Sequence, residues 1–226
     1  IDNEYAFWRQ IKIPEEDTKK EEIAVVKLTG LNLVAQQYAG WALYDLSYTM
    51  EALDEMCNVP GGDGVNALKQ FFLSEAIKGL SQKGFVEESN SLIRKMEEVI
   101  NENPETDELS EISEMDCYNA EIMNNLQQEK FNDALSILNV MRGKCNYGNI
   151  NAVRILMLSH RNIIDMAFQM TKKDVMDCVM ADAKELSEKY PKDVDVQAKW
   201  MLCRLCDLEE RFFDKGETVS LDEVSE

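Results

Sequence analysis

Self-similarity at a fixed offset of 45 residues constrains this sequence more than any other feature. Between residues 64 and 191, apolar or small residues recur in the same register in three successive copies. The columns in the later part of each copy are Val86/Phe131/Met176, Ser89/Ala134/Val179, Ile93/Leu138/Ala183, Met96/Met141/Leu186 and Ile100/Cys145/Tyr190, and those in the earlier part are Leu73/Tyr118/Ile163 and Ile77/Ile122/Ala167. A period of this length is typical of proteins built from stacked helical hairpins.

Apolar residues within each copy are spaced three or four positions apart, which predicts helices. The chain has only 4 Pro and 10 Gly in 226 residues, too few for the many tight turns of an all-β fold. We therefore expect an all-α chain with helices near residues 64–82, 85–102, 108–128, 130–143, 149–170, 173–189 and 193–214. One hairpin cannot bury the apolar stripes of both its helices, so neighbouring hairpins must stack.

The pattern also predicts three regions along the chain. Residues 1–58 should form N-terminal helices, with Gly30 and Gly40 as possible breaks, because glycine weakens a helix interior. The run Pro60-Gly61-Gly62-Asp63-Gly64 predicts a boundary. The repeat region with its capping helix then occupies residues 64–214, and residues 215–226 lack apolar periodicity and should be disordered.

One segment carries a resemblance to a known family. In Glu129-Lys130-Phe131-Asn132-Asp133-Ala134-Leu135 an aromatic residue precedes an alanine by three positions, Gly84 precedes Val86, and Pro191 follows Val179. These residues resemble the turn, second helix and terminal proline of a tetratricopeptide repeat, over roughly residues 64–191. The resemblance implies a right-handed superhelix of antiparallel helical hairpins. HEAT-like repeats are the alternative, because the period exceeds the roughly 34 residues of the tetratricopeptide family.

The resemblance also implies a function and a set of contact residues. In tetratricopeptide-like arrays the first helix of each hairpin lines a concave face that holds an extended peptide or a helix. The 45-residue register carries this role to Phe71, Ser74, Lys78, Asp116, Asn119, Met123, Arg161, Ile164 and Phe168. Aromatic and methionine anchors with a few polar groups suit a protein-binding groove. The resemblance therefore implies a non-catalytic protein–protein interaction scaffold or adaptor.

The charge of the chain bears on its partners. With 43 acidic and 24 basic residues, the net charge is −19. Such a charge repels nucleic acid and anionic membrane surfaces, so we expect neither as a partner, and it suits a basic protein or peptide. Two alternatives stay open: a helical-repeat sensor for a signalling peptide or small ligand, and an acidic mimic of nucleic acid.

Residues that could carry catalytic or metal chemistry are few. His160 is the only histidine, which excludes a metal site of several histidines, and its position within a helix favours a structural role. Cys203-x-x-Cys206 lies in an apolar helical stretch without a second such pair, which favours core packing. The run Gly61 to Gly64 lacks the lysine of a phosphate-binding loop. We predict no catalytic residue, no metal and no cofactor.

The six cysteines are scattered, mostly within apolar helical runs, as expected of reduced thiols. The sequence has no signal segment and no apolar run approaching 18 residues. A cytoplasmic location is therefore the expectation.

Overall fold

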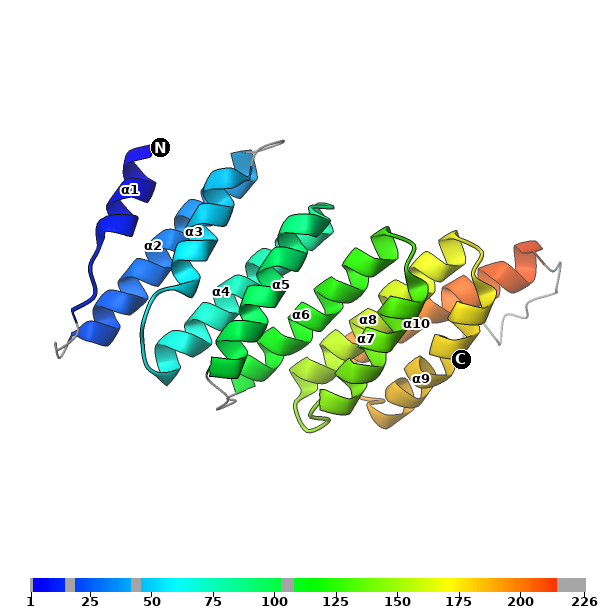
Figure 1. Cartoon of the computed structure of the whole chain (residues 1–226). Helices are drawn as coiled ribbons and strands as arrows, with labels where there is room; N and C mark the ends of the chain where they lie inside the picture. The colour runs from blue at the N-terminus through cyan, green and yellow to red at the C-terminus, as the bar shows by residue number, and fades with distance from the viewer. Residues whose placement is uncertain (1, 15–18, 42–45, 103–107, 215–226) are drawn as a thin grey trace. The chain divides into compact units, whose positions relative to one another are not determined.

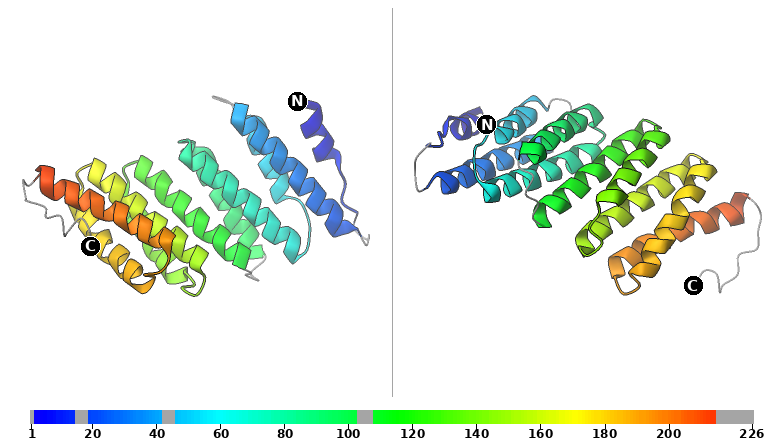
Figure 2. Two further views of the ribbon diagram at one scale, coloured as in Figure 1. Left: turned by 180° about the vertical axis from the view of Figure 1, so that it is seen from behind. Right: turned by 60° about the horizontal axis from the view of Figure 1, so that its bottom comes forward.

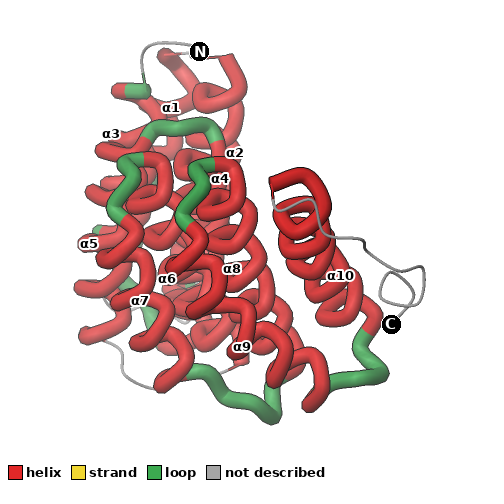
Figure 3. The backbone as a smooth tube through the Cα atoms, turned by 90° about the vertical axis from the view of Figure 1, so that its right-hand side faces the viewer, coloured by secondary structure: helices red, strands yellow, loops and turns green. Residues whose placement is uncertain are grey.

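The computed structural model describes residues 2–14, 19–41, 46–102 and 108–214, and within these ranges every regular element is a helix (Figures 1 and 3). The expected all-α class is confirmed. The elements are α1 (Asp2–Gln10), α2 (Lys20–Trp41), α3 (Ser47–Cys57), α4 (Asp63–Gln82), α5 (Val86–Glu102), α6 (Glu108–Gln127), α7 (Phe131–Lys144), α8 (Ile150–Gln169), α9 (Lys173–Lys189), α10 (Val194–Glu209) and a terminal π-helical turn, η1 (Glu210–Asp214).

The seven helices expected between residues 64 and 214 all form, with ends that differ from the expected ones by a few residues. The expected helix at 193–214 is α10 followed by η1, so the regular α-helix ends five residues earlier. None of the helices in the described ranges is both long enough and apolar enough to cross a membrane.

The chain divides into two compact units, Ile1–Cys117 and Tyr118–Glu226, and the division falls inside α6. The glycine-rich run at residues 60–64, where the sequence suggested a boundary, is the connection between α3 and α4 within the first unit. The C-terminal segment expected to be disordered, residues 215–226, lies outside the described residues.

In the first unit, α2 and α3 form one antiparallel hairpin and α4 and α5 form another, and α2 packs against α4 (Figure 1). The core contains large side chains that are almost completely buried, among them Leu28, Leu31, Leu53, Met56, Leu73, Ile77, Leu92 and Met96. Burial of such a set on folding supplies the main stabilising free energy of the unit.

The helix α1 packs against α2 through a close contact at Gly30. A Cβ atom added to Gly30 would lie 2.2 Å from the indole ring of Trp8, so only glycine allows this approach. Gly30 and Gly40 are therefore not breaks: α2 continues through both to Trp41.

In the second unit, α8 packs against α7, α9 and α10. Figure 2 shows α10, in orange, alongside α8. The buried side chains of this unit include Ile122, Leu126, Leu138, Met141, Leu156, Met157, Ile163, Ile164 and Val179.

The three hairpins α4–α5, α6–α7 and α8–α9 share one turn geometry. The backbone φ angle is positive at Gly84 (81°), Glu129 (58°) and Thr171 (53°). The next residue in each turn donates its N–H to a carbonyl five positions earlier: Phe85 to Leu80 (3.0 Å), Lys130 to Asn125 (2.9 Å) and Lys172 to Ala167 (2.8 Å). A left-handed residue with such a bond is the usual way to end a helix and reverse the chain.

The offset between these turns is 45 residues and then 42, because α9 begins one helical turn early. Its first residues, Lys173 and Asp174, are exposed, and the buried residues then follow the 45-residue register: Met176, Val179, Ala183 and Leu186 correspond to Phe131, Ala134, Leu138 and Met141. Three repeated columns of the second helices, those that begin at Ser89, Ile93 and Met96, are therefore buried in all three hairpins, whereas Val86, Ile100 and Tyr190 in the two outer columns are half-buried.

Candidate protein-interaction surfaces

Four of the expected contact residues lie in the first unit, and only two of them are accessible. Phe71 and Lys78 on α4 are half-buried. Ser74 is buried and its Oγ donates to the Phe71 carbonyl at 2.9 Å. Asp116 on α6 is 8% exposed and lies 3.7 Å from Lys78 Nζ. Ser74 is therefore occupied within α4, and Asp116 connects α6 to α4, so neither side chain is presented to a partner.

The charges around Lys78 are held by neighbours in the same unit. Burial raises the pKa of Asp116 above its usual value, and Lys78 opposes this effect. Burial also acts to lower the pKa of Lys78, but the Glu75 and Asp116 carboxylates outweigh it and raise that pKa. Lys78 Nζ lies 2.6 Å from Glu75 Oε1. Lys78 is therefore a cation already engaged by two carboxylates.

The other five expected residues lie in the second unit. Asn119 is buried, and its Oδ1 accepts hydrogen bonds from Ser159 Oγ (2.9 Å) and Asn162 Nδ2 (3.2 Å). Ile164 is completely buried. Asn119 therefore connects α6 to α8, and Ile164 belongs to the core of the unit.

The remaining three, Met123, Arg161 and Phe168, are half-buried. Arg161 lies 3.7 Å from Asp165. These three residues, with Phe71 and Lys78 of the first unit, are the members of the expected set that keep accessible surface.

A cavity in the first unit is a feature that the sequence did not reveal. It has a volume of about 280 Å³ and is lined by Asn32, Ala35, Gln36, Leu46, Thr49, Leu53, Glu75, Ala76, Gly79, Leu80, Lys83 and Phe85. Small residues on two helices, Ala35, Ala76 and Gly79, keep it open, and a Cβ atom added to Gly79 would meet no other atom within 4 Å. Gly79, in the last turn of α4, was the sequence signal for this space.

The outer face of α10, which we define as Val194, Ala198, Met201, Leu205 and Phe212, is a second apolar surface. These side chains are exposed, with 82% for Val194 and 45% for Leu205. The opposite face contains the buried Val196 and Cys203, and α10 packs there on α8 and α9. The sequence suggested a capping helix in this region, but a capping helix carries a polar outer face.

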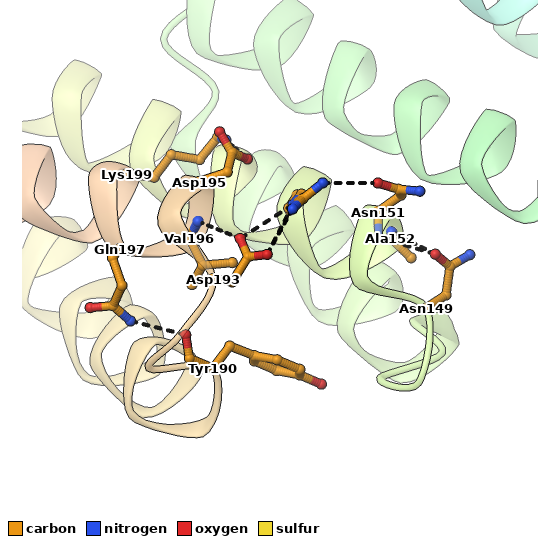
Figure 4. Close-up of polar contacts among 10 residues, drawn as sticks. Asn149, Asn151, Ala152, Tyr190, Asp193, Asp195, Val196, Gln197 and Lys199 are labelled. Carbon is orange, nitrogen blue, oxygen red and sulfur yellow. Dashed lines mark hydrogen bonds and ion pairs between the residues drawn. The ribbon is translucent and has the colours of Figure 1, made fainter.

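A polar cluster joins the first turns of α8 and α10 (Figure 4). Asn149 Oδ1 accepts from the backbone N–H of Asn151 (3.1 Å) and Asp193 Oδ1 accepts from that of Val196 (3.0 Å), so both residues are N-caps. Hydrogen bonds from Arg154 lower the pKa of Asp193. Gln197 Nε2 donates to the Tyr190 carbonyl at 3.2 Å. Because these groups satisfy one another within the chain, the cluster fixes the helix ends.

His160 and Cys203, two of the chemically reactive residues noted in the sequence, lie in buried positions. His160 is buried, its Nδ1 donates to the Leu156 carbonyl at 2.8 Å, and burial lowers its pKa. Burial raises the pKa of Cys203 to about 12 and also raises that of Cys206, so the thiolate is scarce near neutral pH. The core position expected for this pair is confirmed for Cys203, whereas Cys206 is half-buried. The part of the chain that the structure describes contains no group of three or more His, Cys, Asp or Glu side chains suited to a metal.

Comparison of this sequence with protein-family models found no match, and comparison with curated proteins and with solved structures likewise found none.

Proposed function

We propose that this chain is a non-catalytic scaffold or adaptor that binds a peptide or helix of another protein. The proposal includes a right-handed superhelix of hairpins similar to tetratricopeptide repeats, with HEAT-like stacking as the alternative geometry. It is supported by the common turn of three successive hairpins and by their buried 45-residue register. Repeated hairpins of this kind build extended surfaces suited to holding partners.

The observation that carries the proposal is the cavity of the first unit. Its volume of about 280 Å³ is near the lower end of the range for ligand pockets and is sufficient for one or two apolar side chains. Leu46, Leu53 and Leu80 contribute apolar surface to the wall. A partner peptide would place an apolar anchor residue there, as the central residues of protein interfaces do.

The polar residues of the cavity lining indicate which main-chain and charged groups of a partner could bind beside the anchor. Asn32, Gln36 and Glu75 can hydrogen-bond a peptide main chain or a cationic side chain, and Lys83 can donate hydrogen bonds to a carboxylate. The net charge of −19 raises the encounter rate with basic segments. The proposed partner is therefore a peptide in which an apolar anchor is flanked by Lys or Arg.

A cavity-filling substitution tests this site. The purified chain is used to select binders from a random peptide library, and the affinity of the selected peptides is measured by calorimetry. We expect an apolar residue between basic residues in the selected peptides. Gly79→Leu should then weaken binding by about tenfold or more, because the new side chain occupies the cavity.

Gly143→Leu is the matched control. Gly143 also lies inside a helix, α7, and a Cβ atom there likewise meets no atom within 4 Å, but Gly143 is not one of the residues that line the cavity. This control should leave affinity unchanged. Failure to select any peptide, or equal binding by the Gly79→Leu chain, would show the proposal to be wrong.

The same cavity supports a second candidate, a sensor of a small ligand. Its volume is close to the lower end of small-molecule pockets. In this case compounds from a small-molecule library should raise the thermal midpoint of the wild-type and Gly143→Leu chains, but not of Gly79→Leu. A stabilising compound without any selected peptide would favour the sensor over the scaffold.

A further inference from the structure

We propose that the outer face of α10 is a homodimer interface, in which α10 of a second copy packs in parallel and in register. In Figure 3 the helices α7, α8 and α9 lie on one side of α10, and the outer-face residues are exposed. The five residues that form this face come from four turns of α10 and the following η1 turn.

The spacing of these residues is that of a two-helix interface. Val194, Ala198, Met201 and Leu205 are separated by 4, 3 and 4 positions. The alternation ends at Leu205, because Leu208 is buried within its own chain and Phe212 lies in the π-helical turn η1. This alternation of three and four keeps one stripe facing a partner helix along several turns. A helix that only faces water has no need of such a stripe, and exposed contiguous apolar faces mark association sites.

The charged residues on the two flanks of the stripe favour a second copy of α10 as the partner. One flank carries Gln197, Arg204 and Arg211, and the other carries Asp195, Leu202 and Glu209. The two arginines and the two acidic residues balance, although the whole chain has a net charge of −19. A basic peptide would meet arginines on one flank, whereas a second copy of α10 supplies both signs.

The same charged residues favour a parallel orientation of the two α10 helices. In parallel helices a residue on one flank lies near the residue five positions later on the opposite flank of the partner. Arg204 then lies beside Glu209 of the second copy, and the two-fold symmetry forms this pair twice. In antiparallel helices corresponding flanks meet, which brings Asp195 near Glu209 and two Arg204 side chains together. Parallel pairing is therefore favoured by attraction and antiparallel pairing is opposed by repulsion.

Sedimentation velocity on the full chain tests the interface. At about 1–100 µM the wild type should show a reversible monomer–dimer equilibrium. Leu205→Lys places a charge in the centre of the stripe and should raise the dissociation constant by about tenfold or more. Val140→Lys is the matched control, since Val140 on α7 of the same unit is 49% exposed, and it should leave the constant unchanged. Circular dichroism checks that each variant is folded.

Charge reversal tests the orientation. Arg204→Glu and Glu209→Arg should each weaken dimerisation by about fivefold, and the double variant should restore it. A strengthened Glu209→Arg dimer would overturn the parallel arrangement, because an antiparallel one gains attraction to Asp195. A monomeric wild type at all concentrations, an open-ended series of larger assemblies, or a dimer insensitive to Leu205→Lys would overturn the interface itself.

Discussion

Arg154 on α8 holds Asp193, the N-cap of α10, through hydrogen bonds from Nε to both carboxylate oxygens (3.2 Å each) and from Nη2 to Oδ2 (2.8 Å). The same carboxylate accepts the N–H of Val196 at 3.0 Å. One side chain therefore joins α8 to the first turn of α10 and satisfies a backbone donor that the helix leaves open.

Removal of this cap should destabilise the protein measurably. Asp193→Ala should lower the free energy of unfolding in urea by about 1 kcal/mol or more, because it removes both the cap and the contact with Arg154. Asp193→Asn keeps a capping oxygen and should cost less. Asp195→Asn is the control, because Asp195 is exposed and pairs with Lys199 one turn later. Equal losses of unfolding free energy from the substitutions at residues 193 and 195 would contradict the role of Asp193 as cap and as partner of Arg154.

The contact between Asp193 and Arg154 also predicts that stability depends on pH in acidic solution. The folded state lowers the pKa of Asp193 below its usual value of 3.8, so the carboxylate contributes stability above that pH. The contribution should be lost as the pH falls through the lowered pKa. Urea unfolding at several acidic pH values should therefore show the difference between wild type and Asp193→Asn shrinking as Asp193 is protonated.

The turn geometry shared by the three hairpins predicts that removing glycine at one turn position destabilises the chain, whereas introducing glycine at the equivalent positions stabilises it. Gly84→Ala should lower the free energy of unfolding by about 1 kcal/mol, because alanine is strained at a φ of 81°. Glu129→Gly and Thr171→Gly should each raise it by about 0.5–1 kcal/mol by relieving the same strain. Gln128→Gly, next to the turn residue but with a negative φ, should give no gain in thermal or urea unfolding.

The contact between Trp8 and Gly30 predicts a strong coupling. Gly30→Ala should lower the free energy of unfolding by about 1–3 kcal/mol, because the added methyl group overlaps the indole ring. In a Trp8→Ala background the same substitution should become neutral or stabilising. Gly79→Ala is the control and should stabilise by up to about 1 kcal/mol, since its Cβ meets no neighbour. Additive effects of Gly30→Ala and Trp8→Ala in a double-mutant cycle would contradict the contact.

His160 predicts a loss of stability in mildly acidic solution. Burial lowers its pKa below the usual 6.5, and Nε2 has no hydrogen-bond partner among the described residues, so the folded state favours the neutral ring. The nearby charges of Asp182 and Arg142 form an ion pair with each other. Stability should therefore be full above pH 6.5 and decline below it, as the unfolded chain binds the proton more readily.

The chain has no second histidine, so one substitution isolates this effect. The His160→Met chain should lose the decline in thermal midpoint between about pH 7 and pH 5, whereas the wild type keeps it. An equal decline in both chains would assign the pH dependence to other groups.

The helices could be predicted because their signal is local. The three-to-four spacing and the stops near Pro104 and Pro191 fix α4 to α9 within a few residues. The register at 45 residues likewise identified buried positions such as Ala134, Leu138 and Met141, because burial repeats with the hairpin. Gly30 was misread, since a glycine that admits a tryptophan looks the same in sequence as one that interrupts a helix.

The contact surface was harder to predict because accessibility depends on neighbouring helices. Ser74, Asn119 and Ile164 lie on first helices as expected, but they are covered by adjacent elements. The cavity uses residues from three helices, and no spacing along one helix reveals it. The exposed apolar residues of α10 have a helical spacing, but from the sequence alone such a stripe is interpreted as core, because exposure depends on the neighbouring helices.

The common turn also has a consequence for folding kinetics. Each turn is closed by hydrogen bonds between residues no more than five positions apart, and the two helices that it joins are neighbours in the sequence. Little chain entropy is lost in bringing such neighbours together, so any of the three hairpins can serve as a nucleus. We expect refolding on the fast timescale of helical proteins, with growth outward from whichever hairpin forms first.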